Sequence, residues 1–130
     1  MSRRAVFPPG SEATTNQIKV SPAVISNGHV FLTGMTGSGP DGEMPADPGA
    51  QIRAAFDKIG LVLNEAGAGF NSIVEMTSYH VDIRSHFDLF NEIRADYVSD
   101  PFPAWTAVGV AELRRPGAIV EIRVIAALDD

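Results

Sequence analysis

The sequence predicts an α+β protein in which two helices pack on one face of a mixed β-sheet. Segments typical of strands and helices follow one another in the order β-hairpin, α, β, α, β-hairpin. The most regular helical segment carries a single apolar stripe, so only one of its sides is expected to pack. The last strand alternates with a period of two and is wholly apolar on one side, as expected of a strand that covers a core.

The first third of the chain predicts loops and a hairpin. Residues 1–17 are expected to be loop-rich, because their second half is dense in Pro, Gly, Ser and Thr. Residues 18–26 alternate weakly and include a proline, which is typical of an irregular or edge strand. Asn27-Gly28 is a strong hairpin signal and leads into a strand over 29–33. The four glycines of residues 34–42 allow that loop to bring its backbone close to another group.

Two amphipathic helices are predicted next. Asp47 and Pro48 suit the N-cap and the first position of a helix that ends near Gly67. Its apolar residues at helical spacing are Ile52, Ala55, Phe56, Ile59, Val62, Leu63 and Ala66. Ser85 is expected to cap the second helix, which ends before the proline-rich segment 100–103. Its apolar face consists of Phe87, Phe90, Ile93 and Tyr97.

The remaining strands are predicted at residues 73–81, 104–110 and 118–128, and a turn over 114–117 joins the last two into a hairpin. One side of the final strand, expected to face the helices, consists of Ala118, Val120, Ile122, Val124 and Ala126. The other side is mixed and consists of Ile119, Glu121, Arg123, Ile125 and Ala127. A chain of 130 residues has no third layer to cover this half-apolar side, so we expect it to form a cyclic oligomer interface.

Composition excludes several classes of protein. A length of 130 residues indicates one domain, residues 1–130. The absence of cysteine excludes disulfides, Cys-ligated metals and a cysteine nucleophile. A net charge of −6 argues against nucleic-acid partners. The chain has no apolar run of about 18 residues and no secretory signal, so we expect a cytoplasmic protein without a membrane partner. No metal-ligand spacing or nucleotide-binding motif is present, and we expect neither a metal nor a cofactor.

Glu121 and Trp105 are the strongest candidates for functional residues in the sequence. Glu121 is either a surface carboxylate or a partly desolvated group able to act as an acid or base. Trp105, the only tryptophan, is either a packing anchor or part of a site. If the 104–110 and 118–127 strands pair with an even register sum, Trp105 and Glu121 lie on the same face of the sheet.

Residues 103–110 (PAWTAVGV), followed by residues 118–122 (AIVEI), resemble the closing motif of the Rid family, the reactive intermediate deaminases also called the YjgF family. Thr33-Gly34, residues 42–47 and Phe90-Asn91 extend the resemblance, which covers about residues 18–127. The resemblance implies a chorismate-mutase-like fold, a homotrimer with the open sheet face inside, and small-molecule ligand clefts between subunits.

The resemblance also assigns roles to individual residues. Family members of the best-known branch hydrolyse imines and enamines of 2-amino acids, and Glu121 matches the glutamate that positions the attacking water. Asn91 matches a site asparagine. Thr33 and Gly34, with Met35 after them, match the backbone that lines the cleft. Three positions depart from the family: Trp105 stands in place of the arginine that clamps the substrate carboxylate, Ala107 in place of a cysteine, and Val20 in place of a tyrosine.

The substitution at Trp105 changes the expected substrate. An indole offers one N–H donor and cannot replace the bidentate contact of a guanidinium. We therefore expect a larger, flatter or less acidic ligand that stacks on Trp105, with Glu121 ordering water at the C=N carbon. The competing interpretation is a non-catalytic trimeric protein that binds a small molecule. RNA cleavage, a third interpretation attached to this family, is disfavoured by the acidity of the chain.

Overall fold

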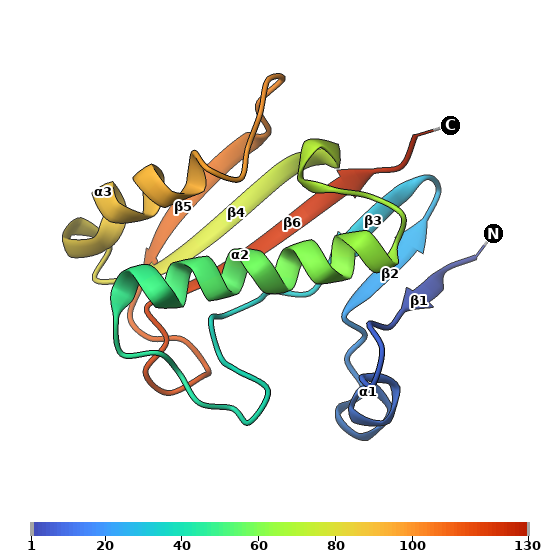
Figure 1. Ribbon diagram of the computed structural model, residues 1–130, viewed down its shortest axis with the longest axis horizontal. Coiled ribbons are helices and arrows are strands. Elements are labelled where there is room, and N and C mark those ends of the chain that lie inside the picture. The colour runs from blue at the N-terminus through green and yellow to red at the C-terminus, as the bar shows by residue number, and fades with distance from the viewer. Residues whose placement is uncertain (1, 130) are drawn as a thin grey trace.

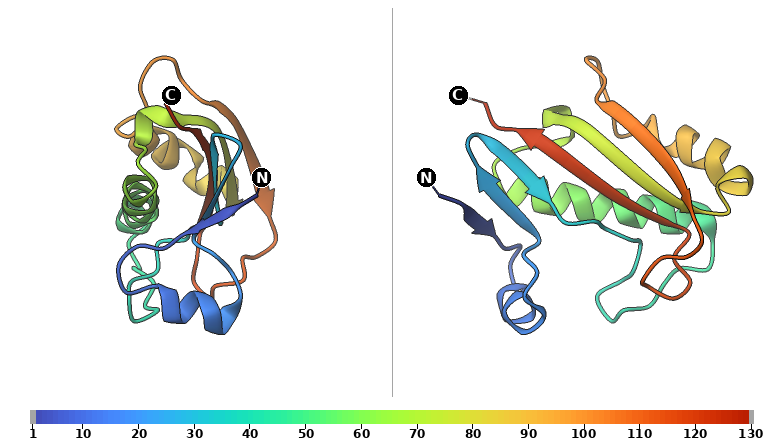
Figure 2. Two further views of the ribbon diagram at one scale, coloured as in Figure 1. Left: turned by 90° about the vertical axis from the view of Figure 1, so that its right-hand side faces the viewer. Right: turned by 180° about the vertical axis from the view of Figure 1, so that it is seen from behind.

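One mixed sheet with two long helices on one face organises the protein in this computed structural model, which describes residues 2–129 (Figure 1). In chain order the elements are β1 (Arg4–Val6), α1 (Glu12–Ile18), β2 (Ala23–Ser26), β3 (His29–Leu32), α2 (Pro48–Glu65), a 3₁₀ turn (Phe70–Ser72), β4 (Ile73–Val81), α3 (Ile83–Arg94), β5 (Ala104–Val110) and β6 (Val120–Ala127). Figure 2 shows α2 and α3 on the same side of the sheet, as predicted, and leaves the other side open. No helix within residues 2–129 is both long and apolar enough to cross a membrane.

The strand order is β1-β2-β3-β6-β4-β5, and it corrects the predicted C-terminal hairpin. The strands β5 and β6 do not pair with each other. The crossover through α3 instead places β5 parallel to β4 at the sheet edge. The last strand, β6, is inserted between β3 and β4 and is antiparallel to both. A central place suits β6, because there the helices cover the whole of its apolar side.

The N-terminal region is more regular than its composition predicts. Within the segment expected to be loop-rich, β1 pairs with β2 and α1 forms one short helix. Lys19, with a φ of 61°, ends α1 in the left-handed region. The prediction of a loop was wrong because β1 is stabilised by the neighbouring strand, which a local pattern does not reveal. The strand expected over 18–26 begins only at Ala23.

The N-cap residues of the two long helices were predicted from the sequence, one correctly and one wrongly. For α2 the prediction is confirmed: the Asp47 carboxylate accepts a hydrogen bond from the Ala50 N–H at 2.9 Å, and Pro48 is the first residue. The predicted cap of α3 was wrong, since the helix starts at Ile83 and its N-cap is Asp82, not Ser85. Asp82 has a φ of 56°, so the chain turns from β4 into the helix within a single residue.

The core lies between the helices and the sheet. The predicted apolar side of the last strand is confirmed, since all five of its residues are at most 6% exposed. Except for Ala66, the predicted stripe of α2 is also buried. The aromatic ring of Phe56 stacks on Tyr97 with centroids 4.6 Å apart and contacts Phe90 at 5.7 Å. On the open side, Phe31 and Val108 remain 38% and 36% exposed.

A buried amide fixes the loops at one end of the sheet. Gln51 in α2 is 2% exposed, and its Nε2 donates to the carbonyl oxygens of Pro45 and Gly117 at 2.9 and 3.1 Å. Its Oε1 accepts from the Ile119 N–H at 2.7 Å. This one side chain therefore joins the loop after β3, the turn before β6 and α2, which fixes where β6 enters the sheet.

Candidate functional site

Glu121 lies on the open face of the sheet, directly opposite Tyr79 of β4. Its side chain is half-buried against the loop that follows β3. A Cβ added at Gly34 would overlap the Glu121 carboxylate, so only a glycine leaves room for the acid in this position. Met35 and Ile122 exchange two backbone hydrogen bonds of 2.8 and 2.9 Å, which hold the loop beside the strand. The structure thus brings together Gly34, Met35 and Glu121, which the sequence analysis had selected.

Thr33 joins this group through the backbone. Its N–H donates to the carbonyl oxygen of Pro22 at 3.0 Å, and the residue is half-buried between β3 and Gly34. The backbone of residues 33–35 is therefore fixed at both ends, which holds Gly34 beside the Glu121 side chain.

Trp105 lies on the other face of the sheet. It is opposite Met76, which is fully buried beneath the helices, whereas Glu121 is opposite Tyr79. Positions 76 and 79 of one strand point to opposite sides. The condition under which Trp105 and Glu121 would share a face, pairing of the 104–110 and 118–127 strands, is not met, because β5 and β6 do not pair. Ala107, opposite Ser78, is on the same side as Trp105.

The indole of Trp105 is packed against α3. Phe87 is parallel to it, with ring centroids 5.5 Å apart and an interplanar angle of 3°. Phe90 contacts it at 6.0 Å, and the guanidinium carbon of Arg94 lies 3.9 Å from its ring centroid. A protein cation therefore lies over the indole ring on which the sequence analysis expects a ligand to stack.

Asn91 belongs to the same cluster. Its Oδ1 accepts hydrogen bonds from the Nε and Nη2 of Arg94 at 3.3 and 3.1 Å. Sequence reasoning selected Asn91 but missed Arg94, although the spacing of three residues on one helix face places their side chains side by side.

A buried polar chain continues from Trp105 into the core. The indole N–H donates to the Ser78 hydroxyl at 2.8 Å, and Nε2 of His80 lies 2.7 Å from the same oxygen. Ser78 and His80 are at most 1% exposed. Burial lowers the pKa of His80, and the neighbouring His86 lowers it further, so the buried imidazole is neutral near pH 7. The spacing of the histidines gave no signal for this arrangement.

The stability of the protein is expected to fall between neutral and mildly acidic pH because of His80. Its pKa is lowered in the folded state, whereas an unfolded histidine titrates near 6.5. The unfolded state therefore binds the proton more readily, and the contribution is complete above about pH 6.5 and is lost as the pH falls toward the lowered pKa. Urea denaturation from pH 7.5 to 5 should show a shallower loss in His80→Gln than in the wild type. His29→Gln, which changes an exposed histidine, should keep the wild-type slope. An unchanged slope in His80→Gln would contradict this assignment.

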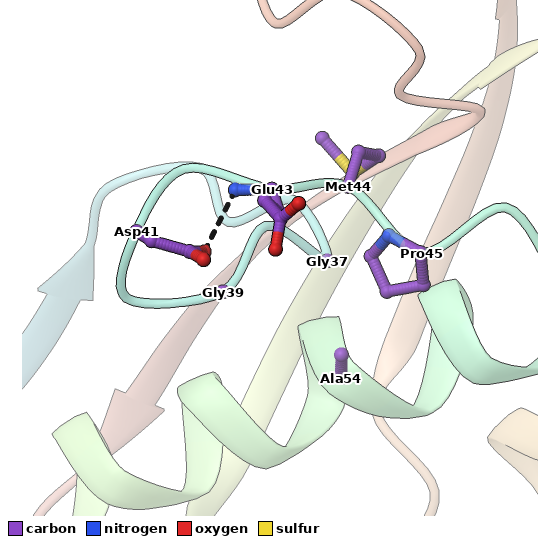
Figure 3. Close-up of a pocket in the computed structure, with 7 residues that line it drawn as sticks. All are labelled: Gly37, Gly39, Asp41, Glu43, Met44, Pro45 and Ala54. Carbon is purple, nitrogen blue, oxygen red and sulfur yellow. Dashed lines mark hydrogen bonds between the residues drawn. The ribbon is translucent and has the colours of Figure 1, made fainter.

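Glu121 is not among the residues that line either of two cavities in the described part of the chain. Figure 3 shows one in the loop after β3, lined by Gly37, Gly39, Asp41, Glu43, Met44, Pro45 and Ala54. Within it the Glu43 N–H donates to Asp41 at 3.0 Å (Figure 3). Another is lined by Ile83, Arg84, Phe87 and Asp88, and it reaches the Trp105 cluster through Phe87. Within residues 2–129, no three His, Asp or Glu side chains are placed to hold a metal ion.

The fold and the site together define a class: α+β proteins of one mixed sheet in which a strand-borne glutamate lies against a glycine of the loop after β3. The chain belongs to the Endoribonuclease L-PSP family, the YjgF/Rid family that its sequence resembles, and the family model matches residues 12–128.

Relatives support this membership along the whole chain. The RutC family protein YjgH of Escherichia coli is 36% identical and covers 100% of this chain and 98% of its own length. A solved structure of protein YjgH superimposes with a TM-score of 0.89 at 35% identity, and covers 100% of this chain and 99% of its own. The 2-iminobutanoate/2-iminopropanoate deaminase of Bos taurus is 32% identical over 82% of this chain and 77% of its own length.

Proposed function

We propose that this protein is a cytoplasmic homotrimer that hydrolyses the C=N bond of a small imine or enamine in a cleft between two subunits. The observation that carries the proposal is the Glu121 carboxylate, half-buried on the open sheet face against Gly34. A deaminase of imino acids among the relatives supports the same reaction class. The family description names an endoribonuclease, but a net charge of −6 disfavours binding to a phosphate backbone.

The separation of the site residues supports a cleft between subunits. Glu121 and Trp105 lie on opposite faces of one sheet, so a single chain does not present both to one ligand. A ligand that contacts both must lie where the open face of one copy meets the β5–α3 edge of another. The exposed Phe31 and Val108 on the open face favour such a contact, since it removes apolar surface from water.

The proposed reaction needs only water as a second reactant. Glu121 orders a water molecule and accepts one of its protons while the oxygen bonds to the C=N carbon, and it then passes that proton to the nitrogen, which gives the carbinolamine and restores the carboxylate. The carbinolamine then returns its hydroxyl proton to the nitrogen through Glu121 and expels ammonia, which leaves a carbonyl product. An enamine enters the same route after it takes up a proton at carbon.

Ammonia release from imines formed in situ from a panel of 2-amino acids tests this proposal. The wild-type protein should accelerate release over the spontaneous rate for at least one imine. Light scattering of the same sample should give three times the mass of one chain. If ligands bind without any acceleration, the competing function, a non-catalytic trimeric binding protein, replaces this one. A monomer would contradict the shared cleft.

Replacing Gly34 with alanine is expected to lower turnover without unfolding the protein. The added Cβ overlaps the end of the Glu121 side chain, which is flexible enough to move away. The backbone of Gly34 does not require the left-handed region, so alanine is tolerated there. Ammonia release should fall about tenfold or more, because small displacements of a reacting group are costly, while the melting temperature stays near that of the wild type. Gly39→Ala is the matched control, since its added Cβ makes only ordinary contacts at 3.4 Å or more. Equal turnover in both variants would contradict the role of Gly34.

A further inference from the structure

We propose that Lys58 is a second reactive group of this protein, an amine that forms an imine with a small uncharged aldehyde beside the cavity in the loop after β3. Lys58 belongs to α2, on the covered side of the sheet (Figure 2), whereas Glu121 lies on the open side. The inference therefore concerns a different place in the fold and does not depend on the proposed hydrolysis at Glu121.

Two buried hydroxyl groups hold the Lys58 amine in place. Its Nζ donates a hydrogen bond to the Ser38 hydroxyl oxygen at 3.1 Å. The Thr36 hydroxyl donates to the same oxygen at 3.3 Å, and Ser38 and Thr36 are at most 7% exposed. The half-buried Lys58 side chain therefore ends on a fixed oxygen. In the neutral amine, the N–H that points at Ser38 directs the nitrogen lone pair away from it.

A glycine brings this loop close enough to α2 for the contact to form. A Cβ added at Gly37 would overlap the backbone carbonyl oxygen of Gln51, so the approach requires a residue without a side chain. Lys58 lies seven residues after Gln51, two turns further along the same face of α2. The packing of Gly37 on the helix therefore brings the next residue, Ser38, within reach of the Lys58 amine.

The Lys58 amine has no acidic partner in the part of the chain that the structure describes. The single ion pair within residues 2–129 joins Arg53 to Asp96, and the Ser38 hydroxyl that binds Lys58 is neutral. Burial lowers the pKa of Lys58, and the charge of Arg115 lowers it further. The neutral form of the amine, which is the nucleophile, is therefore more abundant near pH 7 than in an exposed lysine.

The cavity shown in Figure 3 lies next to this pair of residues. Its lining includes Gly37 and Gly39, the two neighbours of Ser38 in the chain. The lining also includes Ala54, one turn before Lys58 on the same face of α2. A volume of about 400 Å³ is within the range of small-molecule sites. A small molecule in this cavity therefore lies beside the contact between Ser38 and Lys58.

The charges on the cavity wall favour one kind of carbonyl compound. Asp41 and Glu43 are the ionisable residues among those that line it. Their carboxylates repel an organic acid, so an uncharged compound is favoured over an anionic one. Among uncharged carbonyl compounds, a small aldehyde is the one that an amine attacks most readily.

The covalent step needs no reactant other than the aldehyde. The Lys58 nitrogen bonds to the carbonyl carbon, and the Ser38 hydroxyl passes one proton from the nitrogen to the carbonyl oxygen, which gives a carbinolamine. The carbinolamine hydroxyl then takes a proton from solvent, its bond to carbon breaks and water leaves. The product is a protonated imine on Lys58, and water reverses the reaction.

Reductive trapping tests the inference, and Lys19 provides an internal reference because Lys19 and Lys58 are the only lysines of the chain. The full-length protein is incubated with butanal and cyanoborohydride, which reduces an imine to a stable amine, and peptide mass spectrometry follows each lysine separately. Lys58 should be modified at least about tenfold faster than the exposed Lys19, and its rate should saturate with butanal. The rate at Lys58 should also reach its plateau at a lower pH. In concentrated urea the two rates should become nearly equal.

Ser38→Ala should lower the rate at Lys58 at least about fivefold and leave the rate at Lys19 unchanged, because alanine has no hydroxyl to hold the amine and to pass the proton. Ser85→Ala, which removes an exposed serine hydroxyl from α3, is the matched control and should react as the wild type does. Glu121→Gln should also keep the wild-type rate at Lys58, so this test and the ammonia assay can fail independently of each other.

The wild-type protein decides the question even where Ser38→Ala does not fold. Equal rates at the two lysines of the folded protein, a rate at Lys58 that does not saturate, or a difference that persists in concentrated urea would each overturn the inference. In a folded Ser38→Ala variant, an unchanged rate at Lys58 would do the same, because the proposed proton transfer requires the serine hydroxyl.

Discussion

Replacing Glu121 with glutamine is expected to reduce ammonia release at least about 100-fold, as the loss of a general base generally does. The amide has nearly the same size and can still lie against Gly34, so the fold should be unaffected. It cannot accept a proton from water, and the attack on the C=N carbon then depends on solvent alone. The measurement is kcat/KM for the best imine of the panel, with the melting temperature recorded for each variant.

Glu75→Gln is the matched control for this experiment. Glu75 is opposite Ile125 on the same open face, it is exposed, and the substitution removes the same charge. The turnover of the Glu75→Gln variant should remain within about twofold of the wild type, since salt screens the charge of an exposed side chain. If the two variants lose activity equally, the effect comes from the charge of the face and not from a catalytic role of Glu121.

Phe56→Ala is expected to give the largest loss of stability, about 3–5 kcal/mol in the free energy of unfolding. Phe56 is fully buried, and its ring contacts Phe90 of α3 and Tyr97 beyond it. Alanine leaves a cavity between α2 and α3 that neither helix can close without breaking its contacts with the sheet. Urea denaturation at neutral pH measures the loss as a lower midpoint.

Leu61→Ala provides the comparison on the same helix. Leu61 is 65% exposed on the opposite side of α2, and its truncation should change the free energy of unfolding by less than about 0.5 kcal/mol. A similar loss in both variants would show that α2 does not pack by the stripe described above.

Elements whose signals are local were predictable from the sequence. The apolar stripe of α2 and its Asp47 cap specify the helix, because spacing and capping act within a few residues. The alternation along β6 predicts which of its sides is buried, because a strand alternates whatever its neighbours are. Strand pairing is not a local property. The formation of β1 and the place of β6 between β3 and β4 depend on distant segments, so the predicted C-terminal hairpin was wrong.

The candidate site likewise has one part that the sequence predicted and one part that it did not. Glu121 and Gly34 were predicted as site residues from the motif resemblance, since a carboxylate on that strand and a glycine in that loop can both be read from the sequence. The position of Arg94 on the indole of Trp105 was not, because it depends on how α3 lies against β5.

The sequence by itself determined the class of fold, the buried face of each amphipathic element and the family to which the chain belongs. Tertiary structure alone decided that Glu121 and Trp105 lie on opposite sides of the sheet and that a guanidinium covers the indole. The physical reason is that periodicity and capping are properties of neighbouring residues, whereas strand order and helix docking are set by the burial of surfaces contributed by distant parts of the chain.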